Sequence, residues 1–250
     1  MKKTVFITGA TAGIGKACAE KFAANNYRLI ITARREALLE EVRQELVKKY
    51  NADIITLCFD VQDKEAVFKA VGSLEDRDVH ILINNAGLAL GRDPFDQADL
   101  TEWDTMIHTN VNGLLYVSRA LMPAIKRVKG HIVNIGSTAG REVYENGNVY
   151  CASKFAVDAI TKSMRLDLLK YGIKVTAVNP GGVETEFSLV RYRGDEVKAK
   201  NTYTGWEPLT PADVAEAIFY CGSLPAHVCI NDLTITSLDQ ANSFTFLKKS

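Results

Sequence analysis

Short apolar segments rich in β-branched residues recur along the chain, separated by stretches long enough for a helix. These segments are apolar on both faces, as in Leu29-Ile30-Ile31 and Ile132-Val133, which is typical of strands buried in a parallel sheet. The stretches between them fit helices that cover both sides of such a sheet. The pattern predicts about seven strands, at residues 3–8, 28–33, 54–59, 79–84, 131–136, 173–179 and 232–236.

This alternation predicts an α/β fold, namely a doubly wound, Rossmann-type parallel sheet with helices on both faces. We expect a single domain over residues 1–250, because α/β folds of this length form one domain and no linker, repeat or low-complexity segment divides the chain. The half at about 1–130 is expected to bind a cofactor, and the half at about 131–250 to carry catalytic and substrate groups. The least regular stretch, about 185–208, is rich in charged and aromatic residues.

Charge and composition exclude several classes of protein. The 30 basic residues balance 30 acidic ones, so no net charge attracts nucleic acid or an anionic membrane. Five cysteines without a C-x-x-C pair and four scattered histidines argue against disulfides and metal sites. The N-terminal apolar run is too short for a signal peptide, and no 18-residue apolar run follows. We therefore expect a leaderless cytoplasmic protein that binds a small molecule and no nucleic acid, membrane or metal.

Ligands of open parallel sheets bind beyond the carboxyl ends of the strands, so binding residues are expected directly after each strand. The first strand runs into a glycine-rich turn and then into a helix pattern. Glycines there permit a tight turn and close approach to a pyrophosphate, which the free N–H groups of the helix N-terminus would bind. A glycine turn without a ligand is the alternative. The predicted dinucleotide contacts are Gly9, Thr11, Ala12, Gly13, Ile14 and Gly15.

The end of the second strand distinguishes NADP from NAD. NAD-binding folds carry an acidic residue there for the ribose 2′-hydroxyl, whereas this chain has Ala33 followed by Arg34 and Arg35. Two guanidinium groups suit a 2′-phosphate, so NADP(H) is favoured over NAD(H) and over S-adenosylmethionine. The alternative is that both arginines only begin the solvated face of the next helix.

Further cofactor contacts are expected after the third and fourth strands. Asp60 and Val61 are placed to bond an adenine amino group and pack on its ring, although a helix-capping role for Asp60 or Asp63 competes. The small residues of Asn84-Asn85-Ala86-Gly87 would let the backbone pass close to a ribose. Contacts are therefore predicted for Asn85, Ala86 and Gly87, with a polar turn around a left-handed glycine as the alternative.

Ser137 follows the fifth strand, and Tyr150 and Lys154 come later at a spacing that places both on one helix face. A free tyrosine, with a pKa of about 10, is a poor base, but an ammonium group and an oxidised nicotinamide nearby favour its phenolate. Tyr150 would then exchange the hydroxyl proton of a substrate. Ser137 would bond the oxygen on which charge develops during hydride transfer. For the tyrosine and lysine by themselves, an ordinary amphipathic helix face is the alternative.

In this order the motifs resemble the short-chain dehydrogenase/reductase family over nearly the whole chain. The matching features are the glycine turn, Asn84-Asn85-Ala86-Gly87, Ser137, Tyr150 with Lys154, and Pro180-Gly181. The resemblance implies a fourth catalytic residue, Asn110, which bends a helix and holds a water in a proton relay to the lysine. It makes the stretch at 185–208 a mobile substrate lid. It also implies cofactor contacts from Tyr150, Lys154, Pro180, Gly181, Val183 and Thr185.

Stretches beyond the shared motifs are similar to the branch of the family that oxidises short 3-hydroxy acids, such as serine and allo-threonine, with NADP. These stretches are Asn85–Gly91, Ile135–Gly140, Thr185–Arg191 and Leu224–Val228. This branch implies a homotetramer. A substrate carboxylate needs a cation near the nicotinamide and near Ser137, and the candidates are Arg141, Arg191 and Arg193.

Other functions stay open. The chain could be a 3-oxoacyl or general carbonyl reductase of the same family, or an NADP(H)-sensing regulator without catalysis, which the intact Ser137, Tyr150 and Lys154 disfavour. A nucleotide-sugar epimerase or dehydratase shares the tyrosine and lysine but needs a larger substrate domain than residues 181–250 provide. One departure concerns Ala12, because many NADP-preferring relatives carry a basic residue there. The preference for NADP therefore depends on the two arginines after the second strand.

Overall fold

The computed structural model describes residues 2–74 and 77–248; Met1 and residues 249–250, the ends of the predicted domain, lie outside the described residues. Within this part of the chain, seven strands form one sheet in the order β3-β2-β1-β4-β5-β6-β7, and every neighbouring pair is parallel. The strands are β1 (Thr4–Thr8), β2 (Arg28–Ala33), β3 (Ile54–Cys58), β4 (Ile81–Asn84), β5 (His131–Ile135), β6 (Lys174–Pro180) and β7 (Asp232–Ile235).

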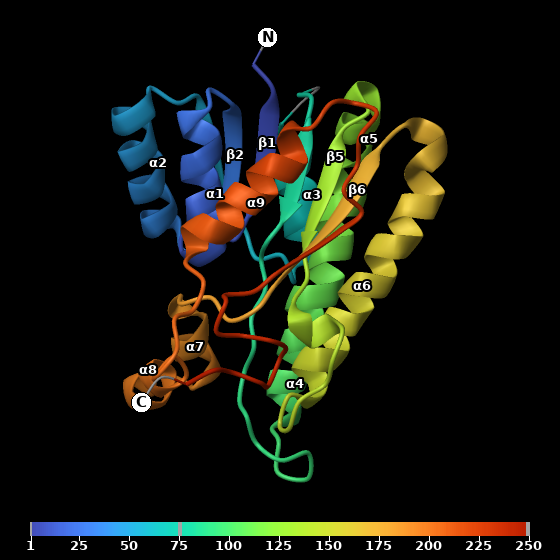
Figure 1. Cartoon of the computed structure of the whole chain (residues 1–250). Coiled ribbons are helices and arrows are strands. Elements are labelled where there is room, and N and C mark those ends of the chain that lie inside the picture. Colours follow the sequence, from blue (N-terminus) through green and yellow to red (C-terminus); the bar gives the residue numbers. More distant parts are fainter. Residues whose placement is uncertain (1, 75–76, 249–250) are drawn as a thin grey trace.

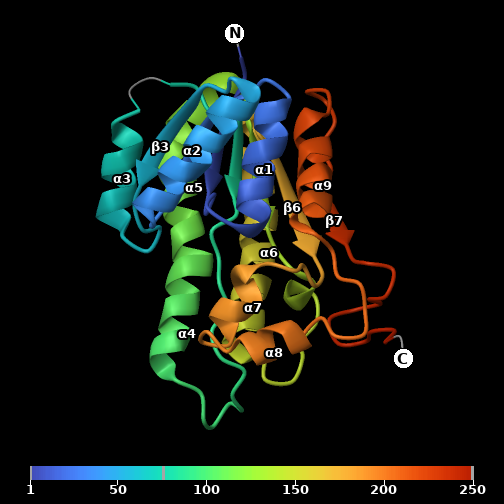
Figure 2. The ribbon, with the colours of Figure 1, turned by 90° about the vertical axis from the view of Figure 1, so that its left-hand side faces the viewer.

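Helices cover both faces of the sheet (Figure 1). One layer consists of α1 (Gly13–Ala24), α2 (Glu36–Tyr50) and α9 (Pro211–Ser223), and the other of α3 (Lys64–Gly72), α5 (Leu114–Val128) and α6 (Asn148–Leu168). Figure 2 shows α3 and α9 on opposite sides of the sheet. Side chains alternate between the layers, since Val5 and Ile7 of β1 pack into one core and Phe6 into the other. This double burial explains why the strands are apolar throughout.

Three shorter helices lie beyond the carboxyl ends of the strands, at the bottom of Figure 1. They are α4 (Leu100–Ile107), α7 (Glu186–Arg191) and α8 (Glu196–Asn201). The last two lie in the stretch expected to be irregular. Between α4 and α5 the chain forms a π-helical turn at His108–Gly113. These segments enclose the end of the sheet where the sequence predicts ligand binding.

The predicted doubly wound fold is confirmed, and each predicted strand agrees with the structure to within two residues at either end. The largest difference is at β4, predicted from 79 and observed from 81. Over the described ranges, none of the helices combines the length and the apolar content that crossing a membrane requires.

Candidate active site

A cavity of about 390 Å³ opens at the carboxyl ends of the central strands. It is lined by most of the residues predicted from the sequence, and also by Phe187 and Val190 of the segment after β6. Gly15, Asn110, Arg141, Arg191 and Arg193 are not part of its lining. The predicted residues that line it are Gly9, Thr11, Ala12, Gly13, Ile14, Arg34, Arg35, Asp60, Val61, Asn85, Ala86, Gly87, Ser137, Tyr150, Lys154, Pro180, Gly181, Val183 and Thr185.

The turn between β1 and α1 needs its glycines. Gly9 has a φ of +68°, and a Cβ atom on Gly15 would lie 2.2 Å from the carbonyl oxygen of Gly9. Ala12 precedes α1 and provides no side-chain cap. The first N–H groups of this helix therefore have no capping side chain as a partner. Asn85 donates to the carbonyl oxygens of Thr8 and Gly9 at 2.9 and 3.1 Å. The fourth strand thus fixes the shape of the turn.

The side chains after β2 are held by neighbours around the cavity. Arg34 lies 3.4 Å from a carboxylate oxygen of Asp60, and Arg35 donates to Thr11 at 3.3 Å and to Glu186 at 3.2 Å. Both arginine side chains are more than half exposed. They can therefore turn toward an anionic ligand.

The structure shows which of the two aspartates after β3 caps the next helix. Asp63 caps α3 and accepts from the backbone N–H of Ala66 at 2.9 Å. Asp60 accepts from the backbone N–H of Gln62 and lines the cavity beside Val61. Asp60 is therefore not the helix cap, and its carboxylate, which also pairs with Arg34, lies at the cavity.

Three polar side chains meet at the inner end of the cavity. Ser137 follows β5, while Tyr150 and Lys154 lie in the first two turns of α6 and are each 8% exposed. The Lys154 ammonium donates to the carbonyl oxygen of Ile135 at 2.9 Å and lies 6.0 Å from the centre of the Tyr150 ring. Burial lowers the pKa of Lys154 to about 8.

Tyr150 experiences opposing influences on its hydroxyl. Burial raises its pKa, and the neighbouring Tyr144 adds to the increase. A hydrogen bond with Ser137 and the positive charge of Arg191 act in the opposite direction and lower the pKa. The two groups that favour the phenolate therefore come from the turn after β5 and from α7.

The three candidate arginines have different surroundings. Arg191, the last residue of α7, places its guanidinium carbon 5.3 Å from the centre of the Tyr150 ring and 5.4 Å from that of Tyr144. Arg193 is paired with Asp93 and Glu102. Among the candidates, Arg191 is therefore the one that the structure brings to the tyrosine.

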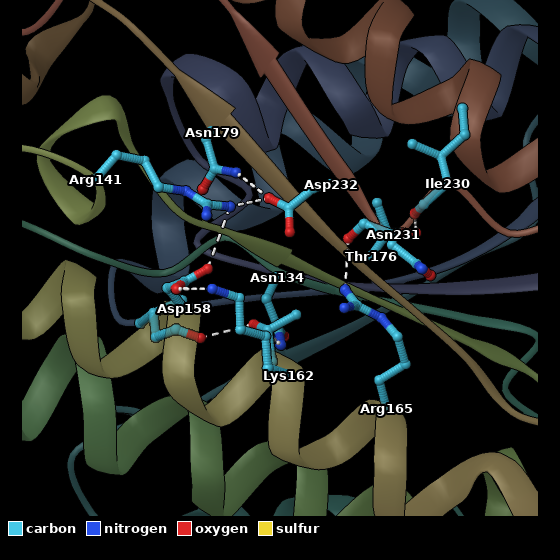
Figure 3. A network of polar contacts seen from close by, with 12 residues as sticks. Asn134, Arg141, Asp158, Lys162, Arg165, Thr176, Asn179, Ile230, Asn231 and Asp232 are labelled. Atoms are coloured by element: carbon cyan, nitrogen blue, oxygen red, sulfur yellow. Dashed lines mark hydrogen bonds and ion pairs between the residues drawn. The ribbon is translucent and has the colours of Figure 1, made fainter.

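Arg141 is paired with Asp158 and Asp232 (Figure 3). It does not line the cavity. Its guanidinium group is therefore engaged by carboxylates of the protein itself, whereas Arg191 lies against the ring of Tyr150.

Asn110 lies in the π-helical turn and is 2% exposed. Its amide nitrogen donates to the carbonyl oxygen of Leu88 at 2.9 Å and to Ser153 Oγ at 3.0 Å, and its oxygen accepts from the N–H of Leu88 at 2.9 Å. Asn110 thus joins the segment after β4 to the helix that carries Lys154.

Sequence reasoning missed several residues of the site. Phe187 packs edge-on against Tyr150 at 5.6 Å between ring centres, and Tyr144 lies between Arg191 and Arg92. Both come from segments without regular periodicity. Their aromatic character was the available signal, but it does not reveal which way a side chain of a short helix or a loop points.

A dinucleotide-type glycine turn and a serine-tyrosine-lysine group around one cavity define a class of oxidoreductases. The profile of the short chain dehydrogenase family matches residues 3–194, so this chain belongs to that family, and the resemblance seen in the motifs is confirmed.

Individual relatives narrow the comparison. The chain is 42% identical to NADP-dependent 3-hydroxy acid dehydrogenase YdfG of Salmonella typhi over 241 residues, 95% of this chain and 96% of the relative. It is 40% identical to serine 3-dehydrogenase of Agrobacterium fabrum over 243 residues, 96% of each chain. A solved structure, the closed form of serine dehydrogenase complexed with NADP⁺, has a TM-score of 0.90 and 41% identity, covering 99% of this chain and 100% of that one.

Proposed function

We propose that this chain is an NADP(H)-dependent oxidoreductase that transfers a hydride to or from a short 3-hydroxy acid such as serine or allo-threonine. The observation that carries the proposal is Arg191 stacked over the ring of Tyr150, which adds a cation for a carboxylate to the hydride-transfer groups. The names of the relatives above support the same cofactor and substrate class.

The residues at the mouth of the cavity fit NADP(H). Gly9 and Gly13, both with positive φ, line the cavity at the turn before α1, where a pyrophosphate would meet the backbone. Arg34 and Arg35 are the partners proposed for the 2′-phosphate, and Asp60 with Val61 for the adenine. When bound, NADP⁺ supplies the acceptor for the hydride that leaves the alcohol carbon.

The other proposed contacts continue along the cavity from the ribose to the nicotinamide. Asn85, Ala86 and Gly87 would lie along the ribose, and the segment after β6 along the nicotinamide. Tyr150 and Lys154 would also contact the cofactor between the ribose and the nicotinamide. The residues proposed after β6 are Pro180, Gly181, Val183 and Thr185.

Proton transfer is assigned to Tyr150. Its phenolate accepts the hydroxyl proton of the substrate, while the Ser137 hydroxyl donates to the substrate oxygen as charge develops there. Lys154, whose pKa burial lowers to about 8, is proposed to favour the phenolate further through its positive charge once substrate and cofactor are bound. Asn110 is proposed to hold the relay that returns the proton from the lysine to solvent.

The segment at about 185–208 is proposed as the substrate lid. It carries Phe187 and Arg191, which already lie against Tyr150. The Nε atom of Arg191 is buried and has no hydrogen-bond partner among the described residues. A substrate carboxylate seated there would give this Nε atom a partner, whereas Arg193 already has two carboxylate partners.

A cytoplasmic homotetramer is proposed for the assembled enzyme. Exposed apolar side chains on α5, α6 and the turn after α6 support an association surface, and they are Leu115, Phe155, Leu166 and Leu169. Light scattering after size-exclusion chromatography tests this proposal, and a monomeric mass would contradict it.

The function is tested by a spectrophotometric panel at 340 nm that pairs NADP⁺ and NAD⁺ with serine, allo-threonine, 3-hydroxypropionate, 3-hydroxyisobutyrate and neutral secondary alcohols. We expect turnover of the acids with NADP⁺. Turnover of neutral or bulky alcohols without the acids would indicate the general carbonyl reductase, and NADPH binding without any turnover would indicate a regulator.

Two variants test the proposed contact between Arg191 and the substrate carboxylate. Arg191→Met should raise KM for the acids at least about tenfold and leave neutral alcohols nearly unchanged. Arg193→Met is the matched control, because it removes the same group from the same segment. An unchanged KM for the acids in Arg191→Met would refute the contact.

A further inference from the structure

Arg141 directly follows the short 3₁₀ turn at Thr138–Gly140, which is capped by the side chain of Ser137. Its guanidinium group is paired with Asp232 of β7 and lies 3.2 Å from an oxygen of Asp158 on α6. Figure 3 shows these two carboxylates approaching the guanidinium from different elements. The Asp158 side chain is 14% exposed and the other two are each 34% exposed, so the network is partly shielded from water.

The contact with Asp158 connects the turn to the catalytic helix. Asp158 lies one helical turn beyond Lys154 on α6, and its other oxygen is held by Lys162 at 2.7 Å. The turn packs closely on this helix, since a Cβ atom on Gly140 would lie 2.7 Å from the carbonyl oxygen of Lys154. The ion pair therefore joins two segments that are already in contact and limits sliding between them.

The contact with Asp232 connects the turn to the end of β6. Asn179, the residue before Pro180, donates to the same Asp232 oxygen at 2.9 Å. The Asn179 side chain also fills the space beside Gly136, where a Cβ atom would lie 2.0 Å from its oxygen. Asp232 therefore links the turn after β5 to the strand end that leads to the cavity.

We propose that Arg141, with Asp158 and Asp232, is a positioning residue that holds Ser137 at a fixed distance from Tyr150. This Arg141 brace rests on the catalytic roles proposed above for the serine and the tyrosine, and not on the identity of the substrate. Ion pairs that water still reaches contribute little to global stability, so the effect of this partly shielded network belongs to local geometry. A displacement of about 1 Å in a catalytic group lowers a rate by as much as roughly 10²-fold.

The variant Arg141→Met removes the charge while keeping an unbranched side chain. We expect kcat to fall roughly tenfold for a 3-hydroxy acid and a neutral alcohol alike, with little change in KM or in the melting temperature. Arg141→Lys keeps a cation and should restore part of kcat. Arg165→Met is the matched control, because Arg165 also joins α6 to the sheet, donating to the carbonyl oxygens of Val175 and Asn231, and should keep the wild-type kcat.

Two kinetic results would overturn the brace. A rise in KM confined to the acids, with kcat for the neutral alcohol unchanged, would assign Arg141 to carboxylate binding. Equal losses of kcat in Arg141→Met and Arg165→Met would show a general effect of removing an arginine.

Amide hydrogen exchange measures the positioning without any substrate. The N–H groups of Ala139 and Gly140 bond to the hydroxyl and carbonyl oxygens of Ser137, so they should exchange faster in Arg141→Met than in Arg165→Met. Unchanged exchange in Arg141→Met would also overturn the brace. If the wild type oxidises no 3-hydroxy acid, the proposed substrate fails, while hydrogen exchange still decides about the brace.

Discussion

Tyr150 depends on its neighbours for its proposed chemistry, because burial by itself favours the neutral phenol. Replacing Tyr150 with Phe removes the hydroxyl and keeps the ring that packs against Phe187. We expect turnover to fall roughly 10³-fold while NADPH binding is retained. Steady-state rates and the quenching of NADPH fluorescence measure the two effects. Substantial remaining activity would assign the proton transfer to another group.

Arg191 is expected to tune this acid/base in addition to its contact with the substrate. Its positive charge lowers the pKa of Tyr150, so Arg191→Met should raise that pKa. Oxidation of an alcohol requires the phenolate, and its rate rises as the pH passes through this pKa. The rising limb of the profile for a neutral alcohol should therefore move to higher pH. An unmoved limb, or an equal movement in Arg193→Met, would contradict the electrostatic role.

The preference for NADP is expected to depend on the residue at the end of β2. Ala33 lines the cavity next to the two arginines, and Ala33→Asp would place a carboxylate where it repels a 2′-phosphate. We expect the ratio of kcat/KM for NADP⁺ to that for NAD⁺ to fall about tenfold or more, equivalent to at least ~1.4 kcal/mol. Ala33→Asn adds a neutral side chain of similar size and should change the ratio much less. Equal effects of the two variants would indicate steric exclusion instead of charge.

The sequence identified residues well where a backbone requirement or a motif specified them. Gly9 and Gly15 were predicted from the glycine turn; Gly9 has a positive φ, and a side chain on Gly15 would collide with the backbone of Gly9. Arg141, Arg191 and Arg193 were indistinguishable, because each is an arginine near a predicted site. What separates them is the direction of a loop side chain and the carboxylates around it, and both depend on the tertiary structure.

At the scale of elements, strands were predictable because two-sided burial leaves a continuous apolar run. Short helices such as α7 and α8 have six residues each, too few to show a helical period, so their stretch was expected to be irregular. The π-helical turn also has no sequence period of its own. The contact of Gln240 with the segment after β6 was missed for a different reason, since Gln240 is a polar residue in a polar stretch.

Gln240 is expected to hold the segment that follows β6. It is 4% exposed, and its side-chain oxygen accepts from the N–H of Gly182 at 2.8 Å while its nitrogen donates to the carbonyl oxygen of Asn242 at 3.0 Å. Gln240→Ala leaves both groups without their partner. The free energy of unfolding should fall by about 1–3 kcal/mol, and KM for NADP⁺ should rise because Gly181 lines the cavity.

Urea unfolding and initial rates measure the two effects of Gln240→Ala. The exposed Gln97→Ala is the control, and it should change neither quantity. A constant KM for NADP⁺ in Gln240→Ala would contradict this role, because the segment after β6 would then be held by its own backbone hydrogen bonds. Emission of Trp206, whose ring centre lies 4.6 Å from that of Phe246, reports whether the C-terminal segment has moved.

At the scale of the whole molecule, the parallel sheet was predictable as a class, but the order of its strands was not. Strand order depends on which face each connecting helix covers, and amphipathic helices on either face have similar sequences. The same central sheet also buries polar groups far from the cavity. These groups determine how stability responds to pH, and His131 is the clearest example.

His131 begins β5 and is 2% exposed, with its Nε2 atom 2.7 Å from Thr176 Oγ1. Burial, with a smaller effect of the Lys174 charge, lowers its pKa to about 3. An unfolded histidine titrates near pH 6.5, so between about pH 6.5 and 3 the unfolded chain binds more protons than the folded one. The stability contributed by the neutral ring is therefore complete above pH 6.5 and is lost as the pH falls through this window.

Between pH 7 and pH 4.5 the wild type should lose about 2 kcal/mol more unfolding free energy than His131→Asn does. Each pH unit within the window contributes up to ~1.4 kcal/mol. Urea unfolding followed by circular dichroism at several pH values measures these slopes. His80 has a pKa lowered in the same direction, but it is present in both proteins and cancels in the comparison. His227→Asn, at an exposed position, should keep the wild-type slope. If His131→Asn also kept that slope, the acid sensitivity of the fold would have to arise from groups other than the buried histidine of β5.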